Sequence, residues 1–525
     1  MSWFKNPWLE NNPWAQGTEE YQKWSPSKQS EGESGYKPKS ISPFFVRFNT
    51  TSNYNGKYGF DTWTKEKEKF LTHVTYKGAR MEKADYYSKT KEKTPPPYNQ
   101  YREGTCFLCL QLGVQANLEM FVESSIEKPI FEDGDMFYIA SSLELNNMVV
   151  SVGGVIANTV GLPVNNSMGH IYSLYPVKAQ NTPVAISIVL KGNELEPKPF
   201  IDREIPLTVY FNKKNSTEFN DIGRIVFFPN RPIIVPVRTV AFVGPSEVDS
   251  FVSTIETIHT TIKTEIQQTL MQACIELKPE SGYSFVKMDA SFNPYIDGNM
   301  LKNLDIQSNS TDEFGNEVDA NGNVVKYKKF IDKFLDASEQ DARNVKHETS
   351  PFKGIVLLLT TLKDQIEQKR GGEGLTFPKN ARQAILYVDV IKENEPMNYA
   401  IYHEISHVLG LLHSFKDNNI QPLIDDIKQR EPLLIKQKEI VEGLNKKDNL
   451  TASEVENIKK FHKNNKYFNN RKEILSLELN RLLLFKEGQT NNVMDYKDQI
   501  SYPFRTYYFW QWQIIRDEAK SYYSV

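Results

Sequence analysis

The chain has 525 residues, of which 39% are hydrophobic, and its 63 basic side chains nearly balance its 66 acidic ones. One hydrophobic core does not serve a chain of this length, so we expect two to four domains. The net charge of -3 gives no reason to expect nucleic acid or an anionic membrane as a partner. No stretch approaches the ~20 apolar residues of a membrane helix, and the polar first residues lack the apolar segment of a secretory signal. The sequence therefore predicts synthesis in the cytoplasm and no membrane span.

Residues 1–100 are polar and rich in Trp, Tyr, Lys and Ser, and we expect them to be partly irregular. Within them, 25–40 has the composition of a linker. From 101 to 230 short apolar runs alternate with turn signals, a spacing typical of an antiparallel β-sandwich or barrel. The runs that predict strands are CFLCLQLGV (106–114), MFYIAS (136–141), MVVSVGGVIA (148–157), VAISIVLKG (184–192), IPLTVYF (205–211) and GRIVFF (223–228).

The chain has three cysteines, Cys106, Cys109 and Cys274. An odd and low number argues against a disulfide framework. Cys106 and Cys109 form a CxxC pair, but no second pair completes a four-cysteine zinc site, so we interpret them as part of a buried strand. His170 has no other histidine near it in the sequence, and we interpret it as structural.

From 231 onward the pattern becomes α/β. PIIVPVRTVAFV (232–243) predicts a strand, and Ser246 and Asp249 are spaced like a capping box that opens a helix. DEFGNEVDANGN (312–323) lacks the register of a calcium loop, so we interpret it as hairpin turns. The helix that Ser246 opens has an apolar stripe of Phe251, Ile255, Ile258, Ile262, Ile266 and Leu270. Further strands are predicted in SFVKMDA (284–290), GIVLLLTTL (354–362) and AILYVDVI (384–391).

The stretch NYAIYHEISHVLGLLHSF (398–415) contains the residues that point to chemistry. His403 and His407 are four apart, so on a helix they project from the same face and two imidazoles can bind one metal ion. Glu404 follows His403 and is placed to take a proton from water without being a ligand. Gly410 allows the helix to end in a sharp turn that brings His413 back as a third ligand. This arrangement predicts an open zinc site with a fourth position for water.

HEISHVLGLLH resembles the HExxHxxGxxH signature of the metzincin zinc peptidases. That family also requires a methionine-containing turn, and NNVMDY (491–496) offers Met494, which the resemblance places as an apolar floor under the histidines. Tyr496 stands where astacin-like and serralysin-like members carry a tyrosine that binds zinc and stabilises the transition state. The resemblance thus makes Tyr496 a candidate zinc ligand and oxyanion stabiliser. The alternative for Tyr496 is a packed core tyrosine.

The resemblance covers about 231–525, but Met494 follows His413 by 81 residues, a longer separation than the family leads us to expect. The intervening insert, about 416–488, is predicted to be helical, with a capping box of Thr451 and Glu454. Its apolar stripe of Ile474, Leu475, Leu479, Leu482 and Leu483 is predicted to end at Gly488. The expected fold is thus multidomain: a polar N-terminal region 1–100, a β-sandwich-like domain 101–230, and an α/β metzincin-like peptidase domain 231–525 with this insert.

These residues predict a zinc-dependent endopeptidase with a protein or peptide substrate. In the metzincins an extended substrate pairs with an edge strand, and GGEGLTF (371–377) is our expectation for that strand or its rim. An active peptidase made without a secretory signal endangers its own cell, so we expect an exported effector or toxin that a contractile injection or type VI machine delivers, with a spike or tube component as partner. The run GRIVFFPNRPIIVPVRTVAFV (223–243) resembles bacterial effectors of the Bacteroidota type. Two alternatives stay open: a non-enzymatic, zinc-containing component of such a machine, and a zinc hydrolase of a non-peptide amide.

Overall fold

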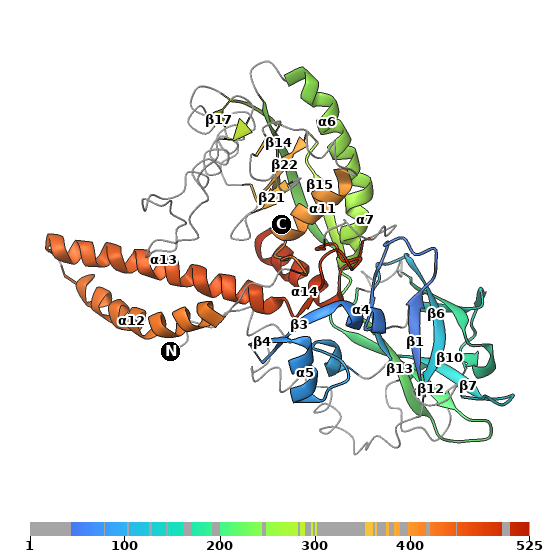
Figure 1. Ribbon diagram of the computed structural model, residues 1–525. Helices are drawn as coiled ribbons and strands as arrows, with labels where there is room; N and C mark the ends of the chain where they lie inside the picture. Colours follow the sequence, from blue (N-terminus) through green and yellow to red (C-terminus); the bar gives the residue numbers. More distant parts are fainter. Residues whose placement is uncertain are drawn as a thin grey trace. The chain divides into compact units, whose positions relative to one another are not determined.

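A computed structural model describes residues 44–523, apart from 78, 102–103, 125–128, 143–144, 146, 161–170, 192–199, 244–247, 282–283, 289–295, 298–299, 302–351, 361–362, 365–373, 377–382, 389–396, 416–420, 448 and 496–504. The chain, drawn as a ribbon in Figure 1, consists of two units. The first unit draws on Met1–Ile234, Gln267–Glu276 and Leu482–Lys520, and the second on Val235–Ile266, Leu277–Arg481 and Ser521–Val525. The predicted multidomain character is confirmed at this level, with sheets in the N-terminal and central parts and helices toward the C-terminus.

Two sheets of the first unit pack face to face as a sandwich around one hydrophobic core. The five-stranded sheet has the order β1-β6-β11-β8-β9. Its strands are β1 (Phe44–Thr50), β6 (Gln115–Ser124), β11 (Val184–Leu190), β8 (Met148–Val152) and β9 (Val155–Ile156). The six-stranded sheet has the order β10-β7-β12-β13-β5-β2. Its strands are β10 (Ile171–Lys178), β7 (Met136–Ser142), β12 (Ile205–Asn212), β13 (Asn220–Phe227), β5 (Thr105–Cys109) and β2 (Gly59–Thr62).

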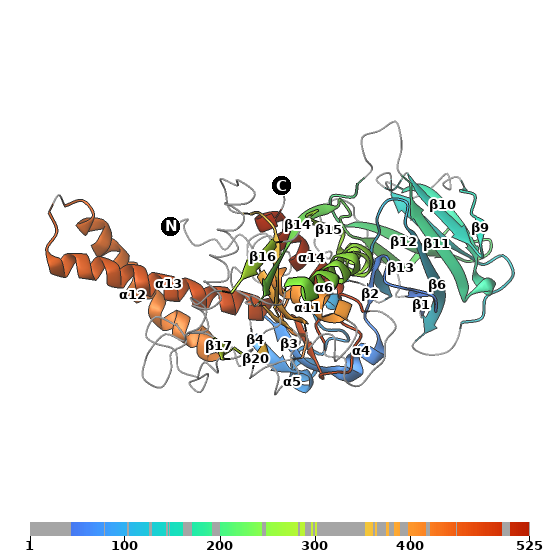
Figure 2. The same cartoon turned by 90° about the horizontal axis from the view of Figure 1, so that it is seen from above.

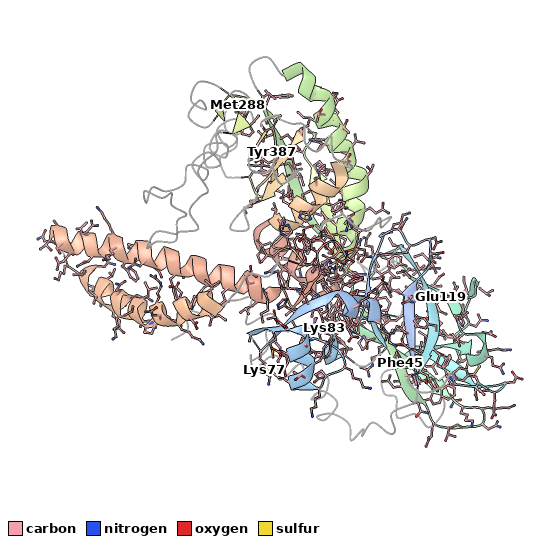
Figure 3. The ribbon with its side chains drawn as sticks, in the orientation of Figure 1. Phe45, Lys77, Lys83, Glu119, Met288 and Tyr387 are labelled. Atoms are coloured by element: carbon pink, nitrogen blue, oxygen red, sulfur yellow. The ribbon has the colours of Figure 1, made fainter. Side chains whose placement is uncertain are left out.

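Alternation of apolar and polar side chains explains why these strands form a sandwich. On β6, Leu118 and Met120 are fully buried while Glu119 between them, which is labelled in Figure 3, is exposed. The six strands predicted between 101 and 230 are confirmed, and so is the burial of Cys106 and Cys109 within β5. One pair departs from the antiparallel expectation, because β13 and β5 run parallel.

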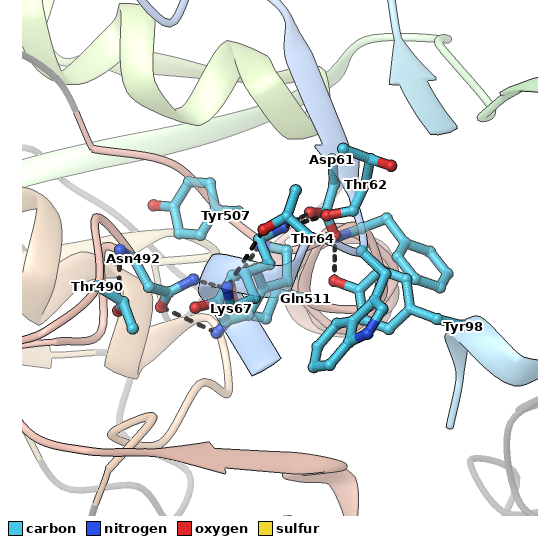
Figure 4. Close-up of polar contacts among 12 residues, drawn as sticks. Asp61, Thr62, Thr64, Lys67, Tyr98, Thr490, Asn492, Tyr507 and Gln511 are labelled. Atoms are coloured by element: carbon cyan, nitrogen blue, oxygen red, sulfur yellow. Dashed lines mark hydrogen bonds and ion pairs between the residues drawn. The ribbon is translucent and has the colours of Figure 1, made fainter. Parts of the chain in front are cut away.

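The first unit also joins segments from both ends of the chain. A small sheet has the order β23-β3-β4, in which Leu483–Phe485 (β23) pairs with Leu71–Tyr76 (β3) and β3 with Ala79–Glu82 (β4). The buried carboxylate of Asp61 accepts a hydrogen bond from the Tyr98 hydroxyl at 2.6 Å (Figure 4) and another from the backbone N–H of Phe509 at 2.9 Å. Asp61 also pairs with Lys67, so its charge is compensated. The helices of this unit include α4 (Lys65–Phe70), α5 (Lys83–Thr90), α7 (Gln267–Leu270) and α14 (Phe509–Glu518).

The second unit is built on a mostly parallel sheet with the order β15-β14-β19-β22-β21. β14, β19 and β22 are parallel, and β21 pairs antiparallel with β22 at the end of this order. The bounds are β14 (Ile233–Val243), β15 (Ile275–Pro279), β16 (Ser284–Lys287), β19 (Ile355–Thr360), β21 (Gly374–Thr376) and β22 (Gln383–Tyr387). All four strands predicted here from sequence are confirmed. Three short strands, β17 (Ile296–Asp297), β18 (Met300–Leu301) and β20 (Lys363–Asp364), form a separate sheet.

Helix α6 (Val248–Thr261) continues into a π-helical turn, η4 (Ile262–Ile266). Its predicted apolar stripe is confirmed, because Ile255, Ile258, Ile262 and Ile266 are all at most 1% exposed. These four isoleucines on one face favour packing of the helix, since burying each such side chain contributes roughly 1.5–3 kcal/mol to the free energy of folding. The proposed cap at Ser246 and the turns at 312–323 lie outside the described residues, as does His170.

Two long helices, α12 (Gln421–Leu444) and α13 (Ala452–Asn480), run side by side as a hairpin (Figures 1 and 2). The predicted cap is confirmed: the Thr451 side chain accepts from the Glu454 N–H, and the Glu454 side chain accepts from the Thr451 N–H. The predicted helical stripe up to Gly488 is wrong. The helix ends at Asn480, and Leu483 begins β23, where pairing with β3 satisfies its backbone groups.

Apolar residues seven apart hold the two helices together. Ile427 and Leu434 on α12 and Phe468 on α13 are buried in the hairpin core. The Asn464 side chain donates to Gln437 at 3.4 Å, a polar pair between the helices of the kind that fixes register in coiled coils. Among the helices that the structure describes, none has the length and apolar character to cross a bilayer.

Candidate metal centre

Helix α11 (Met397–Val408) carries the first two histidines of the motif. It packs against β21 and β22, and its apolar face of Ile401, Ile405 and Val408 is at most 4% exposed. That face fixes the rotation of the helix, and the four-residue spacing then places His403 and His407 one turn apart on another side. His403 is 5% exposed and His407 is partly buried.

The chain leaves α11 through a turn that only a residue tolerant of positive φ adopts easily. Gly410 has φ 87°. Its N–H donates to the His407 carbonyl at 2.9 Å, and the N–H of Leu411 donates to the Ser406 carbonyl at 3.0 Å. These two bonds are the 5→2 and 6→1 pair of a Schellman motif, which satisfies the last carbonyls of the helix. The turn reverses the chain, so that His413 comes back toward the two helical histidines.

The three imidazoles meet at their Nε2 atoms. Nε2 of His413 lies 3.2 Å from Nε2 of His403 and 3.2 Å from Nε2 of His407. A ring nitrogen carries one proton or one lone pair, so one hydrogen bond cannot account for both short approaches. Two nitrogen atoms that bind one tetrahedral zinc ion at about 2.0–2.1 Å lie about 3.3 Å apart. The two observed distances are close to that value, and the ligand atoms of the three histidines all lie within 4.8 Å of one another, close enough together to hold one ion.

A hydrogen bond sets which nitrogen of His407 is available to a metal. Its Nδ1 donates to the Leu411 carbonyl at 2.7 Å, because the carbonyl oxygen can only accept. In the neutral ring this leaves the lone pair on Nε2, which faces the other histidines. Burial lowers the pKa of His407 to about 4, with the Leu411 bond opposing the shift, so the ring is neutral near pH 7 as a metal ligand must be.

The backbone of His413 has a partner far along the chain. The Arg481 guanidinium donates from Nη1 to the His413 carbonyl at 3.0 Å, across 68 residues of sequence. Arg481 also forms an ion pair with Glu478, and both side chains are buried at 5% and 6% exposure. The ring of Phe415 stacks on that of His413 at 5.0 Å between centroids. Sequence reasoning missed Arg481, because the predicted helix continued to Gly488 and gave position 481 no signal of its own.

The sequence also predicted site roles for Glu404, Met494 and Tyr496. Glu404 lies on α11 next to His403 and is 7% exposed. Met494 belongs to the first unit, so its position under the histidines stays a prediction. Met494 lies in a turn, where its N–H donates to the Asn492 side chain at 2.9 Å. Tyr496 lies outside the described residues, and its role also stays a prediction.

The predicted substrate strand is present as an edge strand. Within 371–377 the structure describes β21, whose residues Gly374, Leu375 and Thr376 pair with Leu386, Ile385 and Ala384 of β22. β21 ends the described order of its sheet, and α11 packs against it. Helix α11, which carries His403 and His407, and this edge strand are therefore neighbours within one unit, while the pairing of β21 with a substrate stays a prediction.

No protein-family model matches the sequence, and no curated protein matches it. Among the residues that the structure describes, His403, His407 and His413 are the one group of side chains arranged to hold a metal ion.

Proposed function

We propose that the protein is a zinc-dependent endopeptidase of the metzincin type. The observation that supports this most directly is the 3.2 Å spacing of the Nε2 atom of His413 from those of His403 and His407, together with the carboxylate of Glu404 on the same helix. Three neutral imidazoles form a ligand set of open catalytic zinc sites, in which the fourth position takes water or substrate. Cu, Fe and Ni also accept imidazole, so the identity of the ion is part of the proposal.

When bound at these three histidines, zinc supplies Lewis-acid chemistry that lowers the pKa of water toward neutrality and polarises a carbonyl. Glu404 is the base of the proposed reaction. Its carboxylate follows His403 directly in α11 and is nearly buried, so it is close to the ligand set without belonging to it. Glu404 takes the proton from the attacking water as the C–O bond forms at the scissile carbonyl. It then gives that proton to the amine nitrogen as the C–N bond breaks.

A peptide is the substrate that the neighbouring strand favours. β21 pairs with β22 on one side and lies at the end of the described sheet order. An extended peptide can add to such an edge through main-chain hydrogen bonds, and α11 packs against the same strand. A substrate held in this way would present successive peptide groups near the helix that carries His403 and Glu404.

The decisive experiment combines metal analysis with a proteolysis assay on the Glu404→Gln variant. The purified protein should contain about one zinc ion per chain and should cleave casein or a peptide mixture, and a chelator should remove both properties. Glu404→Gln should retain the zinc and lose nearly all turnover. Glu442→Gln is the matched control, because this exposed glutamate on α12 lies outside the site. Equal cleavage by the Glu404 variant would end the proposed mechanism.

Other outcomes separate the alternatives. Zinc binding without cleavage of any peptide would favour a non-enzymatic component, and cleavage of small amides alone would favour a non-peptide hydrolase. We further propose that the protein is exported by an injection machine, since an active peptidase threatens the cell that makes it. Co-purification with a spike or tube component would support this route, and retention in the producing cells with no such complex would contradict it.

A further inference from the structure

The hairpin of α12 and α13 (421–480) follows the third histidine closely in the sequence and ends at Arg481, whose side chain contacts that histidine. His413 precedes the hairpin by a few residues, and Arg481 is the C-cap residue of α13. The backbone of Arg481 leaves the helical region with φ -79° and ψ 82°, and its N–H donates to the Glu478 carbonyl. The helix therefore stops at the residue whose side chain reaches His413.

Of the three histidines, His413 is the one that secondary structure does not fix. His403 and His407 are carried by α11, whose apolar face is packed against the sheet. His413 follows the Gly410 turn in a segment without regular structure. Its direction toward the other two rings therefore depends on local contacts, and its main-chain carbonyl is held by Arg481.

The hydrogen bond from Arg481 to the His413 carbonyl is formed by buried, charge-compensated side chains. Arg481 and Glu478 are 5% and 6% exposed, so this charged hydrogen bond operates in a poorly solvated place where it is stronger than at the surface. The Glu478 carboxylate offsets the charge of the guanidinium, which removes the cost of an unpaired buried cation close to a metal site. A guanidinium also has a planar fork of donors, so it can bind the carboxylate and the carbonyl together.

We infer that Arg481 is a positioning residue for the metal centre: by holding the His413 carbonyl, it fixes the third ligand and fastens the base of the hairpin to the site. This inference rests on the metal site proposed above. Partners that orient a ligand from outside the coordination shell typically contribute 10–100-fold to metal affinity. The zinc affinity of the protein should therefore depend on a residue 68 positions away from the ligand that it orients.

The test measures the dissociation constant for zinc by competition with a chromophoric chelator, alongside thermal unfolding of the metal-free protein. Arg481→Ala should weaken zinc binding about 10–100-fold. Because this variant removes the guanidinium that offsets the buried Glu478 carboxylate, a second variant carries both Arg481→Met and Glu478→Gln, which removes the donor together with that buried charge. It should weaken zinc binding to a similar extent. Arg481→Lys keeps a charge but not the fork, and should fall between Arg481→Ala and the wild type.

Arg516→Ala is the matched control. Arg516 is also buried, at 2% exposure, and donates to the backbone carbonyls of Ala273 at 2.9 Å and Arg231 at 3.1 Å, but it belongs to the first unit. This variant should lower the unfolding temperature and leave the zinc dissociation constant unchanged. If the Arg481 variants bind zinc as tightly as the wild type, the positioning role is wrong while the metal site stands. If the wild type itself binds no zinc, the proposed function fails first.

Discussion

Replacing Gly410 tests whether the turn after α11 places His413 as the third ligand of the proposed zinc site. The residue has φ 87°, and an L-residue with a Cβ in the left-handed region costs roughly 1–2 kcal/mol. Gly410→Ala therefore meets a strain of that size whenever the chain adopts the turn that returns His413. The metal-bound state requires this turn, whereas the metal-free chain can relieve the strain by unwinding the last turn of the helix. We expect the zinc dissociation constant to rise by roughly 5–30-fold, the factor that corresponds to 1–2 kcal/mol.

The assay is the same chelator competition, combined with thermal unfolding of the loaded and the metal-free protein. The zinc-loaded protein should lose more stability than the metal-free protein, because zinc binding prevents the last turn of α11 from unwinding to relieve the strain at position 410. Gly410→Asn should fall between alanine and the wild type, since asparagine tolerates the left-handed region. Gly443→Ala on α12 is the matched control: a Cβ there meets no atom within 4 Å, so alanine should add up to about 1 kcal/mol of helix stability. It should not change zinc binding. If Gly410→Ala binds zinc as tightly as the wild type, the turn does not set the third ligand.

Two further predictions concern the segment around Met494. Asp495 is fully buried, and its carboxylate accepts from the Gly488 N–H at 2.7 Å, the Thr490 N–H at 2.8 Å and the Thr490 hydroxyl at 2.7 Å. Asp495→Ala leaves two buried N–H groups without this acceptor, so we expect a loss of about 3 kcal/mol or more in thermal or urea unfolding, and a smaller loss for Asp495→Asn. An unfolding midpoint equal to that of the wild type would show that water replaces the carboxylate. Tyr496→Phe should lower kcat by about 10²–10³ if the hydroxyl donates to the oxyanion, whereas unchanged kcat with a lower unfolding temperature would indicate a packing role.

The parts of the fold that could be predicted are those with a local signal. The four-residue spacing of His403 and His407, the glycine at the turn and the capping box at Thr451 each lie within a few residues of chain. Helical and strand periods are also local, and so the stripe of α6 and most of the sandwich strands could be located. β6 shows the same alternation from Ala116 to Val122, a signal that our sequence reasoning passed over. β10 was missed as well.

Features that depend on partners distant in sequence could not be predicted. Leu483–Phe485 continues the apolar spacing of α13, and only the presence of β3 makes a strand the better solution for its backbone. The parallel pairing of β5 with β13 likewise joins segments that are more than a hundred residues apart. The contact of Arg481 with His413 belongs to the same class, because no sequence pattern indicates that a buried arginine at a helix end donates to a carbonyl 68 residues earlier.

The structure of the insert also explains how the proposed metal site tolerates a long separation between His413 and the strand that follows the insert. Loop-closure entropy rises only slowly with length, so 60 or more residues between a ligand and the next element of the fold cost little more than 20, provided that the ends are held together. Here the insert is itself ordered, since its two helices pack through Ile427, Leu434 and Phe468. Its ends are joined at the base by Arg481 and the His413 carbonyl. Because the two ends of the hairpin are joined in this way, its helices can be long without changing the position of His413. That position then depends on the hydrogen bond from Arg481 and not on the length of the helices.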